Sequence, residues 1–252
     1  MPSPRAEDTR GTLFVTGGSR GIGAAVVRQA SAAGYNVAFT YVRDGGAAGA
    51  LVAEIAGAGR RAIAIKADIA SEDDIVAGFR AADDAFGPLT ALVNNAGIIG
   101  ATGRVADVER AMLENLFAVN VTGTLLCCRE AVRRMSTARG GSGGAIVNVS
   151  SRAAGLGGGG VYVHYAASKG AIDSLTIGLA REVAAEGIRV NAVAPGIIDT
   201  EIHAPGRLES LVPSVPMQRA GKAGEVAEAI LWLLSPASSY VTGAVLEIGG
   251  GR

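Results

Sequence analysis

Tyr165 and Lys169, in the stretch Tyr165-Ala-Ala-Ser-Lys169, are the residues whose types and spacing point most directly to chemistry. Two residues four positions apart lie on the same face of a helix, one turn from each other. A phenol with an ordinary pKa of about 10 is a poor acid-base catalyst at neutral pH. An ammonium about 4 Å away, at an effective dielectric of about 20, favours the phenolate by about 4 kcal/mol, or roughly three pKa units. The spacing therefore predicts a tyrosine whose pKa its lysine neighbour brings toward neutrality. A solvated lysine on a surface helix is the alternative interpretation.

The composition argues against several classes of function. The 252 residues are 49% hydrophobic, and 23 basic residues balance 23 acidic ones. This balance is not typical of proteins that bind nucleic acids or membrane surfaces. Residues 1–10 are charged and contain prolines, so we expect a flexible segment and not a signal peptide. No apolar run approaches the roughly 18 residues of a membrane span. We therefore expect a cytoplasmic protein without a nucleic-acid or membrane partner.

The cysteines and histidines do not have the spacing of a metal site. His164 and His203 are the two histidines, and Cys127 and Cys128 are adjacent. Adjacent residues of a helix point in different directions, so a disulfide between the two cysteines is not expected. We expect no bound metal, give His164 no role, and interpret His203 as a solvated loop residue that could also meet the substrate.

Apolar runs alternate with helical patterns along the whole chain. Strands are expected at residues 13–15, 36–41, 61–67, 89–93, 145–149, 188–193 and 241–248. Helices are expected at residues 24–33, 45–59, 71–86, 105–134, from about 165 to 186, and 224–234. This alternation predicts an α/β fold with a doubly wound, parallel, seven-stranded sheet of the Rossmann type. Residues 11–252 are expected to form one catalytic domain.

Polar, glycine or proline residues follow the predicted strands. They are Thr16-Gly17, Asp68, Asn94-Asn95, Ser150-Ser151 and Pro195-Gly196. Ligands of open parallel sheets bind beyond the carboxyl ends of the strands, so we expect these residues to meet in one crevice. The turn over residues 16–23 leads from a strand into a helix. Its glycines allow main-chain N–H groups to approach a phosphate.

Three other segments are expected to be loops. Residues 197–220 show no sustained period and contain three prolines, which predicts a substrate lid without regular structure. Residues 139–144 are predicted to be a mobile linker. Residues 157–160, all glycine, are predicted to be a flexible loop beside the substrate pocket.

Taken together, these motifs closely resemble those of the short-chain dehydrogenase/reductase family, near its ketoacyl-acyl-carrier-protein reductases and glucose dehydrogenases. The resemblance covers about residues 11–252. It rests on the T-G-x-x-x-G-x-G turn at 16–23, N-N-A-G at 94–97, Ser151, Y-x-x-x-K at 165–169, and P-G at 195–196. It implies an oxidoreductase that transfers a hydride between a nicotinamide cofactor and a carbonyl or secondary alcohol.

The resemblance also implies the role of each catalytic residue. Tyr165 would be the general acid-base, and Ser151 would hold the substrate oxygen. Lys169 would lower the pKa of the tyrosine and bind the nicotinamide ribose. Asn120 would anchor a water chain that leads from Lys169 to solvent. Ser150 also lies at the strand end, but the family spacing favours Ser151.

A larger set of residues is implied to surround the cofactor. Its members are Gly17, Ser19, Arg20, Gly21, Ile22, Gly23, Tyr41, Arg43, Asp68, Ile69, Asn95, Ala96, Gly97, Tyr165, Lys169, Pro195, Gly196, Ile198 and Thr200. Asp68 would contact the adenine, and it could cap a helix as well.

The residues near the second strand favour NADP(H) over NAD(H). An acid at the end of that strand would bond the ribose 2′-hydroxyl and repel a 2′-phosphate. The corresponding position here is Tyr41, which is not acidic. Arg20 and Arg43 could both face this place, and guanidinium groups suit a phosphate monoester. Two solvated surface arginines are the alternative interpretation.

The substrate and the assembly are less determined. The helix of Tyr165 carries small residues, namely Ala166, Ala167, Gly170, Ala171 and Ser174, and the resemblance implies a homotetramer with such helices at an interface. Reduction of ketoacyl thioesters and oxidation of a sugar or polyol remain alternatives within the family. A different class, an NADP(H)-binding sensor or scaffold without catalysis, is disfavoured because a simple binder does not need the tyrosine.

Overall fold

The apolar runs of the sequence form strands that are largely buried within one sheet, which explains why they show little polar–apolar alternation. The computed structural model describes residues 10–201 and 207–252. Neighbouring strands of the seven-stranded sheet all pair in parallel. The strands are β1 (Thr12–Val15), β2 (Asn36–Tyr41), β3 (Ala62–Lys66), β4 (Leu89–Asn94), β5 (Gly144–Val149), β6 (Ile188–Pro195) and β9 (Val245–Ile248).

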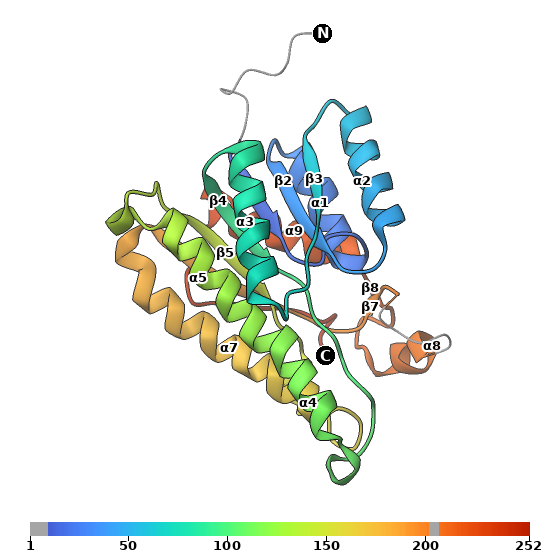
Figure 1. Cartoon of the computed structure of the whole chain (residues 1–252). Helices are drawn as coiled ribbons and strands as arrows, with labels where there is room; N and C mark the ends of the chain where they lie inside the picture. The colour runs from blue at the N-terminus through green and yellow to red at the C-terminus, as the bar shows by residue number, and fades with distance from the viewer. Residues whose placement is uncertain (1–9, 202–206) are drawn as a thin grey trace.

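The strand order reverses at the centre of the sheet. The order is β3-β2-β1-β4-β5-β6-β9, so the chain moves outward from β1 to β3 and then crosses back to β4 (Figure 1). A reversal of this kind leaves a crevice beyond the carboxyl ends of β1 and β4. The predicted doubly wound sheet of the Rossmann type is confirmed. A separate pair of short parallel strands, β7 (Ile198–Asp199) and β8 (Gly221–Lys222), lies apart from this sheet.

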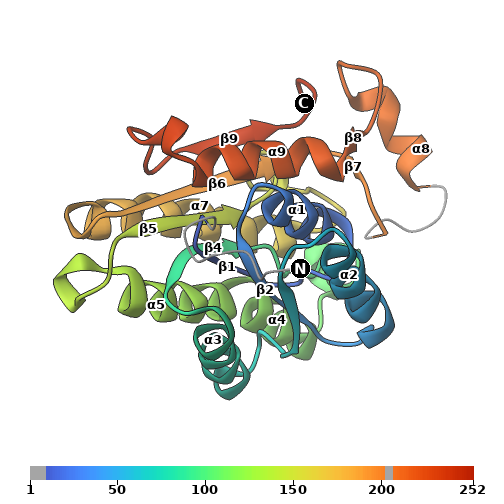
Figure 2. The same ribbon diagram turned by 90° about the horizontal axis from the view of Figure 1, so that it is seen from above.

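Helices cover both faces of the sheet (Figures 1 and 2). The helices on one face are α1 (Gly21–Ala32), α2 (Gly45–Gly57) and α9 (Ala223–Leu234). The helices on the other face are α3 (Glu72–Phe86), α5 (Thr124–Met135) and α7 (Val163–Val183). The remaining α-helices of the described chain are α4 (Arg110–Phe117), α6 (Ala153–Leu156) and α8 (Arg207–Leu211). Each face buries its own apolar cluster, so both layers stabilise the sheet.

A buried polar ladder holds the helix of Tyr165 against the sheet. Asn94 Nδ2, at the end of β4, donates to Asn148 Oδ1 on β5 at 2.9 Å. Asn148 Nδ2 in turn donates to Thr176 Oγ1 on α7 at 2.9 Å. All three side chains are buried, where an unpaired polar group would be costly. The ladder therefore fixes α7 relative to the strand ends.

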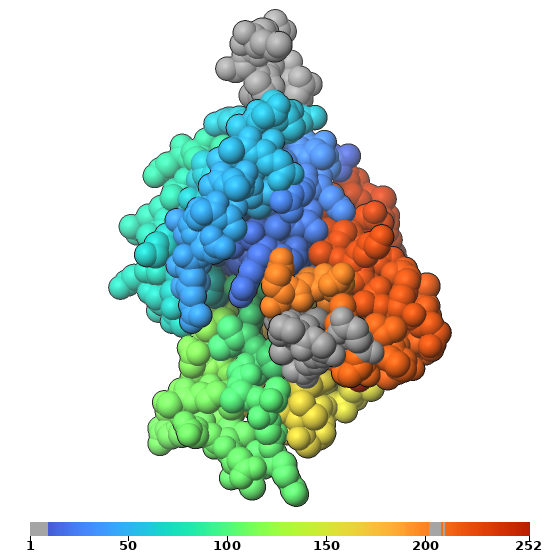
Figure 3. Space-filling model, turned by 90° about the vertical axis from the view of Figure 1, so that its right-hand side faces the viewer, coloured from blue at the N-terminus to red at the C-terminus, as the bar shows by residue number. Residues whose placement is uncertain are grey.

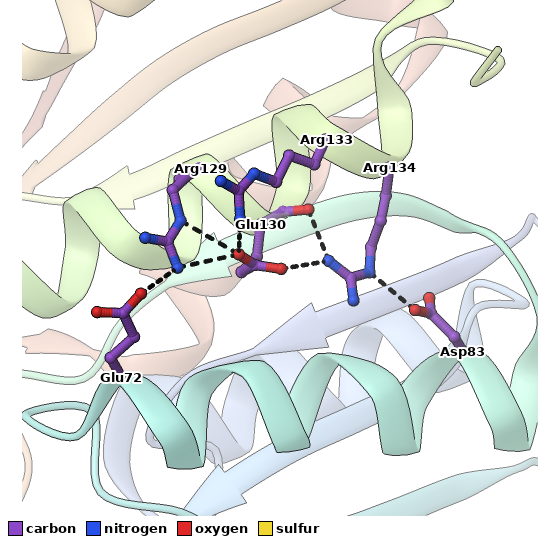
Figure 4. A network of polar contacts seen from close by, with 6 residues as sticks. All are labelled: Glu72, Asp83, Arg129, Glu130, Arg133 and Arg134. Carbon is purple, nitrogen blue, oxygen red and sulfur yellow. Dashed lines mark hydrogen bonds and ion pairs between the residues drawn. The ribbon is translucent and has the colours of Figure 1, made fainter. Parts of the chain in front are cut away.

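Glu130 is the centre of an ion-pair network that ties α5 to α3 (Figure 4). Its side chain is 6% exposed, and it accepts hydrogen bonds from three arginines of its own helix, Arg129, Arg133 and Arg134. Arg129 also pairs with Glu72 of α3, and Arg134 with Asp83 of α3, each at 2.8 Å. Burial opposes ionisation of Glu130, but the arginines outweigh it and hold the pKa of this carboxyl below its ordinary value.

The predicted helix over residues 105–134 is correct from Arg110 onward and wrong for its first five residues. Val105–Asp107 forms a 3-10 turn, and Val108 and Glu109 are extended, so the α-helix begins at Arg110. From there a helical run continues to Met135 through a π-helical segment, Ala118–Gly123. Such π segments often occur at functional sites. This one contains Asn120.

The same helical run, Arg110–Met135, is long and apolar enough to cross a membrane by length and composition alone, with a mean hydropathy of 1.4. Core helices of soluble proteins pass the same test. Here the residues Cys127, Ala131 and Met135 pack in the cluster that covers the sheet. Packing against the sheet accounts for this part of the apolar pattern. Both cysteines are free and buried.

The prediction of a mobile linker at residues 139–144 is wrong. The Gly143 N–H donates to the Met135 carbonyl at 2.7 Å, and Gly144 begins β5. A Cβ at Gly143 would lie 2.5 Å from the main-chain oxygen of Gly187. The glycines of this turn therefore serve close packing of the backbone.

The predicted lid at residues 197–220 contains more regular structure than expected. Its described part includes β7, α8 and a 3-10 turn at Val212–Ser214. Pro213 lies at the start of that turn, where a proline removes no hydrogen bond. Residues 202–206, which include His203 and Pro205, lie outside the described residues, as do residues 1–9 of the predicted N-terminal segment.

Candidate active site

The carboxyl ends of the strands open into one cavity of about 520 Å³. All residues predicted to bind the cofactor line it except Gly23, and all of the predicted catalytic residues line it except Asn120. Gly23 lies directly beneath the wall, where a Cβ would come within 2.2 Å of the Gly17 carbonyl oxygen. Figure 3 shows an orange segment around residue 200 beside the blue N-terminal part of the chain. A Cβ at Gly21 would lie 3.5 Å from Thr200 of that segment.

The turn between β1 and α1 has the properties of an anion site. Gly17 and Gly21 have φ angles of 64° and 53°, which glycine adopts without strain. Arg20 precedes α1 with an extended backbone, its side chain does not cap the helix, and the first turn contains no acid. The N–H groups of a first helical turn have no partner within the helix, and they lie at the positive end of its dipole. This part of the cavity therefore fits a pyrophosphate.

Two arginines lie where the cavity reaches the end of β2. Arg20 and Arg43 are exposed, line the cavity with Tyr41, and form no ion pair within the described part of the chain. Asp44 is close by in sequence, but its carboxylate accepts the Ala47 N–H at 2.8 Å and caps α2. This end of the cavity therefore offers two guanidinium groups that are not engaged in ion pairs within the described residues.

Asp68 lies on the cavity wall, but it is not the cap of α3. It lines the cavity after β3, and its Oδ1 accepts the Ala70 N–H at 2.9 Å. The cap of α3 itself is Ser71, which accepts from Asp74 N–H at 3.3 Å. Asp68 therefore stabilises the turn before α3 while it faces the cavity.

Tyr165 and Ser151 meet at the wall of the cavity. The Ser151 side chain hydrogen-bonds the Tyr165 phenol, and the Ala153 N–H donates to Ser151 Oγ at 3.1 Å. Burial raises the pKa of Tyr165, and the Ser151 hydrogen bond opposes this only in part. The phenol is therefore protonated at neutral pH. The sequence-based prediction of a tyrosine pKa near neutrality is wrong for the protein chain by itself.

Lys169 explains why that prediction fails. Its ammonium lies 5.8 Å from the centre of the Tyr165 ring and donates to the Val149 carbonyl oxygen at 2.7 Å. Burial lowers the pKa of Lys169 to about 8, and the charge of Asp173, one turn further along α7, opposes the shift. The helical spacing of Tyr165 and Lys169 is as expected. The sequence did not indicate that Lys169 is buried and Tyr165 partly buried, and desolvation disfavours the charged form of each.

Asn120 is buried behind the cavity and positions its wall. Its Oδ1 accepts the Ile98 N–H at 2.9 Å, and its Nδ2 donates to the Ile98 carbonyl at 2.8 Å and to Ser168 Oγ at 3.0 Å. A Cβ at Gly97 would lie 3.4 Å from both Asn120 Oδ1 and Lys169 Nζ. Asn120 thus lies near Lys169 and holds the chain after β4.

Asn95 and Ser150 have structural contacts that the sequence did not predict. Asn95 Nδ2 donates to the carbonyls of Thr16 and Gly17, at 3.0 and 2.8 Å, so this side chain braces the β1–α1 turn. Thr16 Oγ1 accepts the N–H groups of Asn95 and Ala96, both at 3.0 Å. Ser150 Oγ donates to the Lys169 carbonyl at 3.3 Å, whereas Ser151 faces Tyr165.

The substrate end of the cavity was largely missed by sequence reasoning. Beyond Tyr165 the wall includes Arg152, Leu156, Tyr162, Leu211 and Arg252. The Tyr162 ring makes an edge contact with the Tyr165 ring at 5.9 Å. Gly158, with φ 62°, makes room for it, because a Cβ there would lie 2.6 Å from the Tyr162 ring. Glycine at this position therefore shapes the wall, and no motif in the sequence indicated this.

The described residues contain no group of three or more His, Cys, Asp or Glu side chains that could hold a metal ion. His164, for which the sequence suggested no role, is buried, and neither ring nitrogen has a hydrogen-bond partner in the described part of the chain.

The comparisons with known proteins agree with this geometry. Residues 17–252 match the family model described as Enoyl-(Acyl carrier protein) reductase. The chain is 52% identical over 243 residues to the uncharacterized oxidoreductase YgfF of Escherichia coli K12, covering 95% of this chain and 98% of the relative. The chain belongs to the short-chain dehydrogenase/reductase family. It is an oxidoreductase of that family, as the motifs implied.

Other members of the short-chain dehydrogenase/reductase family are similar over nearly the whole chain. A 3-oxoacyl-[acyl-carrier-protein] reductase of Synechocystis is 36% identical over 247 residues, which cover 96% of this chain and 97% of the relative. The crystal structure of a short chain dehydrogenase from Burkholderia cenocepacia J2315 in complex with NADP superimposes with a TM-score of 0.91. It is 36% identical, and the match covers 97% of this chain and 98% of that one.

Proposed function

We propose that the chain is an NADP(H)-dependent oxidoreductase that acts on a carbonyl/secondary-alcohol pair with Tyr165 as general acid-base. Bound NADP(H) would supply or accept the hydride. The observation that carries the proposal is the contact of Ser151 with Tyr165 in the same cavity as the free N–H groups of α1. A hydride acceptor needs a proton donor on its oxygen, and these residues provide one beside an anion site.

In the reduction direction, Tyr165 donates its phenolic proton to the carbonyl oxygen of the substrate. Because burial keeps the phenol protonated, it is suited to this step at neutral pH. Ser151 hydrogen-bonds the same oxygen and holds it within reach of the phenol. Lys169 places positive charge behind the phenol as the proton leaves, which favours the phenolate. In the oxidation direction the same proton returns to Tyr165.

The cofactor preference rests on Arg20 and Arg43. We infer that the first turn of α1 binds the pyrophosphate and that the two guanidinium groups bind the 2′-phosphate of NADP(H). The NADP bound to the solved relative from Burkholderia cenocepacia supports this inference. Asp68 and Ile69 would contact the adenine, and Pro195, Gly196 and Thr200 would line the nicotinamide.

Replacing both Arg20 and Arg43 by Gln is expected to remove the preference for NADPH over NADH. Each charge-assisted hydrogen bond to a phosphate contributes about 1.5–3 kcal/mol, so the ratio of kcat/KM values should fall by a factor of about 10² or more. Steady-state kinetics with both cofactors measure the ratio. Arg139→Gln, an exposed arginine outside the cavity, is the control. Equal use of both cofactors by the unaltered protein would contradict the inference.

The reaction itself is tested by NADPH oxidation with a panel of ketones, ketoacyl thioesters and sugars. Turnover of a ketone or ketoacyl thioester would support carbonyl reduction, the class of reaction that the name of the Synechocystis relative indicates. Turnover only of sugars or polyols with NADP⁺ would favour the sugar dehydrogenase alternative. Tight NADPH binding without turnover of any compound would favour a sensor or scaffold.

We also propose that the protein is a cytoplasmic homotetramer with α7 at an interface. Gly170 has no atom within 4 Å of an added Cβ, and Ala167, Ser174 and Ile177 are exposed on the same helix. These residues form an outward strip of small and apolar side chains that permits close helix packing. Ala166, which the sequence suggested for this strip, is instead buried within its own chain, because it lies on the inner face of α7.

Light scattering is expected to give a mass of four subunits, and Ile177→Arg is expected to lower it. Ile177 is 39% exposed in the single chain, so the substitution should leave the fold intact while it places charge in a packed contact. Ala56→Arg, at an exposed position of α2 on the other face of the sheet, adds the same charge and is the control. A single-subunit mass of the unaltered protein would contradict the assembly.

A further inference from the structure

The substrate end of the cavity combines apolar walls with two arginines. Leu156, Tyr162 and Leu211 provide the apolar surface, and Arg152 and Arg252 provide the charge. The acids that line the cavity, Asp44, Asp68 and Glu201, come from elsewhere in the fold. Asp44 and Asp68 follow β2 and β3, and Glu201 lies beside Gly21 of the phosphate turn. The acids that line the cavity therefore come from elements other than those that carry Arg152 and Arg252.

Arg152 is held firmly and has its charge compensated. It follows Ser151 directly, and its main-chain N–H donates to the Pro195 carbonyl at 2.9 Å. Its guanidinium contacts the carboxylate of Glu247, and its Nε donates to the main-chain oxygen of Arg252 at 2.7 Å. The side chain is only 19% exposed. Arg152 therefore acts as a fixed support for the backbone of residue 252.

The segment Gly249–Gly251 packs closely against its neighbours as it approaches Arg152. Gly250 and Gly251 have φ angles of 62° and 89°, which favour glycine. A Cβ at Gly249 would lie 3.2 Å from Arg152 Cγ, and one at Gly250 would lie 2.8 Å from Val215. The Met217 N–H donates to the Gly250 carbonyl at 3.1 Å. The segment is therefore anchored on both sides, and its path places Arg252 on the cavity wall.

The guanidinium of Arg252 makes no hydrogen bond or ion pair with the side chains that the structure describes. Arg252 lines the cavity that Leu156 and Tyr162 also line, and its main-chain oxygen is held by Arg152, the residue that follows Ser151. A planar guanidinium matches a carboxylate through two parallel hydrogen bonds, so a guanidinium that has no ion-pair partner suits a carboxylate ligand.

We propose that the substrate is a ketone or secondary alcohol whose apolar body carries a carboxylate, and that Arg252, supported by Arg152, binds this group. The inference rests on the proposed oxidoreductase function and names the substrate class of the same site. Leu156 and Tyr162 contact the apolar body, and the reacting oxygen lies toward Ser151 and Tyr165. Arg252 thereby selects acids over neutral compounds of the same shape.

The test is calorimetric titration of the protein saturated with NADP⁺ by cyclohexanecarboxylate and, separately, by cyclohexanecarboxamide. The two probes share a ring and differ in charge. The carboxylate is expected to bind at least about tenfold more tightly, because hydrogen bonds to charged groups are the stronger ones. Arg252→Gln should bring the ratio close to one, whereas Arg139→Gln, which removes an equal charge outside the cavity, should preserve it.

Equal binding of the two probes to the unaltered protein, binding of neither, or a ratio that survives in Arg252→Gln would overturn the inference. A failure of the proposed function looks different, because NADP⁺ itself would then not bind, or no ketone would be reduced. If NADP⁺ does not bind, the same titrations are made without cofactor. The comparison of the unaltered protein with Arg252→Gln then shows whether Arg252 binds the carboxylate. If no ketone is reduced, the acid-selective binding is still measured on the complex with NADP⁺.

Discussion

Tyr165→Phe is expected to lower kcat/KM for carbonyl reduction by a factor between about 10² and 10⁴, the usual contribution of a positioned general acid. The substitution removes the phenolic proton and little else, since Phe retains the ring that packs edge-on against Tyr162. Steady-state NADPH oxidation with any ketone that the protein reduces measures the effect. Fluorescence titration with NADPH should give nearly the same dissociation constant as the unaltered protein.

The matched control for this substitution is Tyr35→Phe. Tyr35 is buried in the apolar cluster beneath α1, α2 and α9 and does not line the cavity. Loss of its hydroxyl should leave kcat/KM within a factor of about two. If Tyr165→Phe were as active as Tyr35→Phe, the proton would come from another group, and the assignment of Tyr165 would be wrong.

Lys169→Met is expected to make the protein more stable at pH 7 while it abolishes most of the activity. The shift of the lysine pKa from 10.5 to about 8 corresponds to an unfavourable burial of about 3 kcal/mol. Loss of the hydrogen bond to the Val149 carbonyl removes about 1 kcal/mol of stabilisation. The free energy of unfolding should therefore rise by about 2 kcal/mol. Residues that a functional site requires commonly lower the stability of the folded protein.

The buried Lys169 also makes the free energy of unfolding depend on pH. Below pH 8 Lys169 is protonated in both the folded and the unfolded chain, so the folded state bears the full penalty of the buried charge. Between pH 8 and 10.5 the unfolded chain binds the extra proton, so stability rises with pH in this window. The gain in stability of Lys169→Met over the unaltered protein should therefore shrink over the same window.

Tyr165 and Cys128 change the stability with pH in the direction opposite to Lys169. The pKa of Tyr165 is raised above 10, and that of Cys128 is raised from 9 to about 12, both by burial. Their contributions to stability are lost as the pH rises above their unfolded values. Comparison of the variant with the unaltered protein by denaturant unfolding at each pH cancels these terms. An unfolding free energy that is lower in Lys169→Met at pH 7, or a difference that does not vary with pH, would contradict this account.

Much of the sheet could be predicted because its strands are continuous apolar runs that end in glycine, proline or polar residues. β2 has the predicted bounds, Asn36–Tyr41, and the core of each other strand of the main sheet falls within the predicted range. The residues at the carboxyl ends also converge as expected, since parallel topology requires it. Sequence patterns fixed by local geometry and by burial were therefore informative.

The remaining features depend on contacts between distant segments. The π-helical segment contains Asn120, which pairs with Ile98 and Ser168, and no helical period reveals this pairing. The glycines near 143 looked like a linker because close packing and mobility leave the same composition. The charge state of Tyr165 depends on burial, and the spacing to Lys169 does not report burial.

Arg252 was missed for a similar reason. A glycine-rich segment at residues 249–251 has no helical or strand period, and its path is defined by Arg152 and Val215, which lie far away in the sequence. The conversion of such a segment into a wall of the cavity is visible only in three dimensions. Substrate contacts of this fold generally come from such variable loops, so the motifs that reveal the cofactor site say little about them.

The central claim, direct hydride transfer from NADPH to a carbonyl carbon, is tested most directly with NADPH deuterated at its transferable position. The ketone that gives the highest turnover is reduced with this cofactor, and the product alcohol is analysed by mass spectrometry and NMR. We expect one deuterium on the carbinol carbon. The deuterium should be transferred from only one face of the nicotinamide ring. Consumption of NADPH that leaves the alcohol unlabelled, or deuterium released into water, would contradict it.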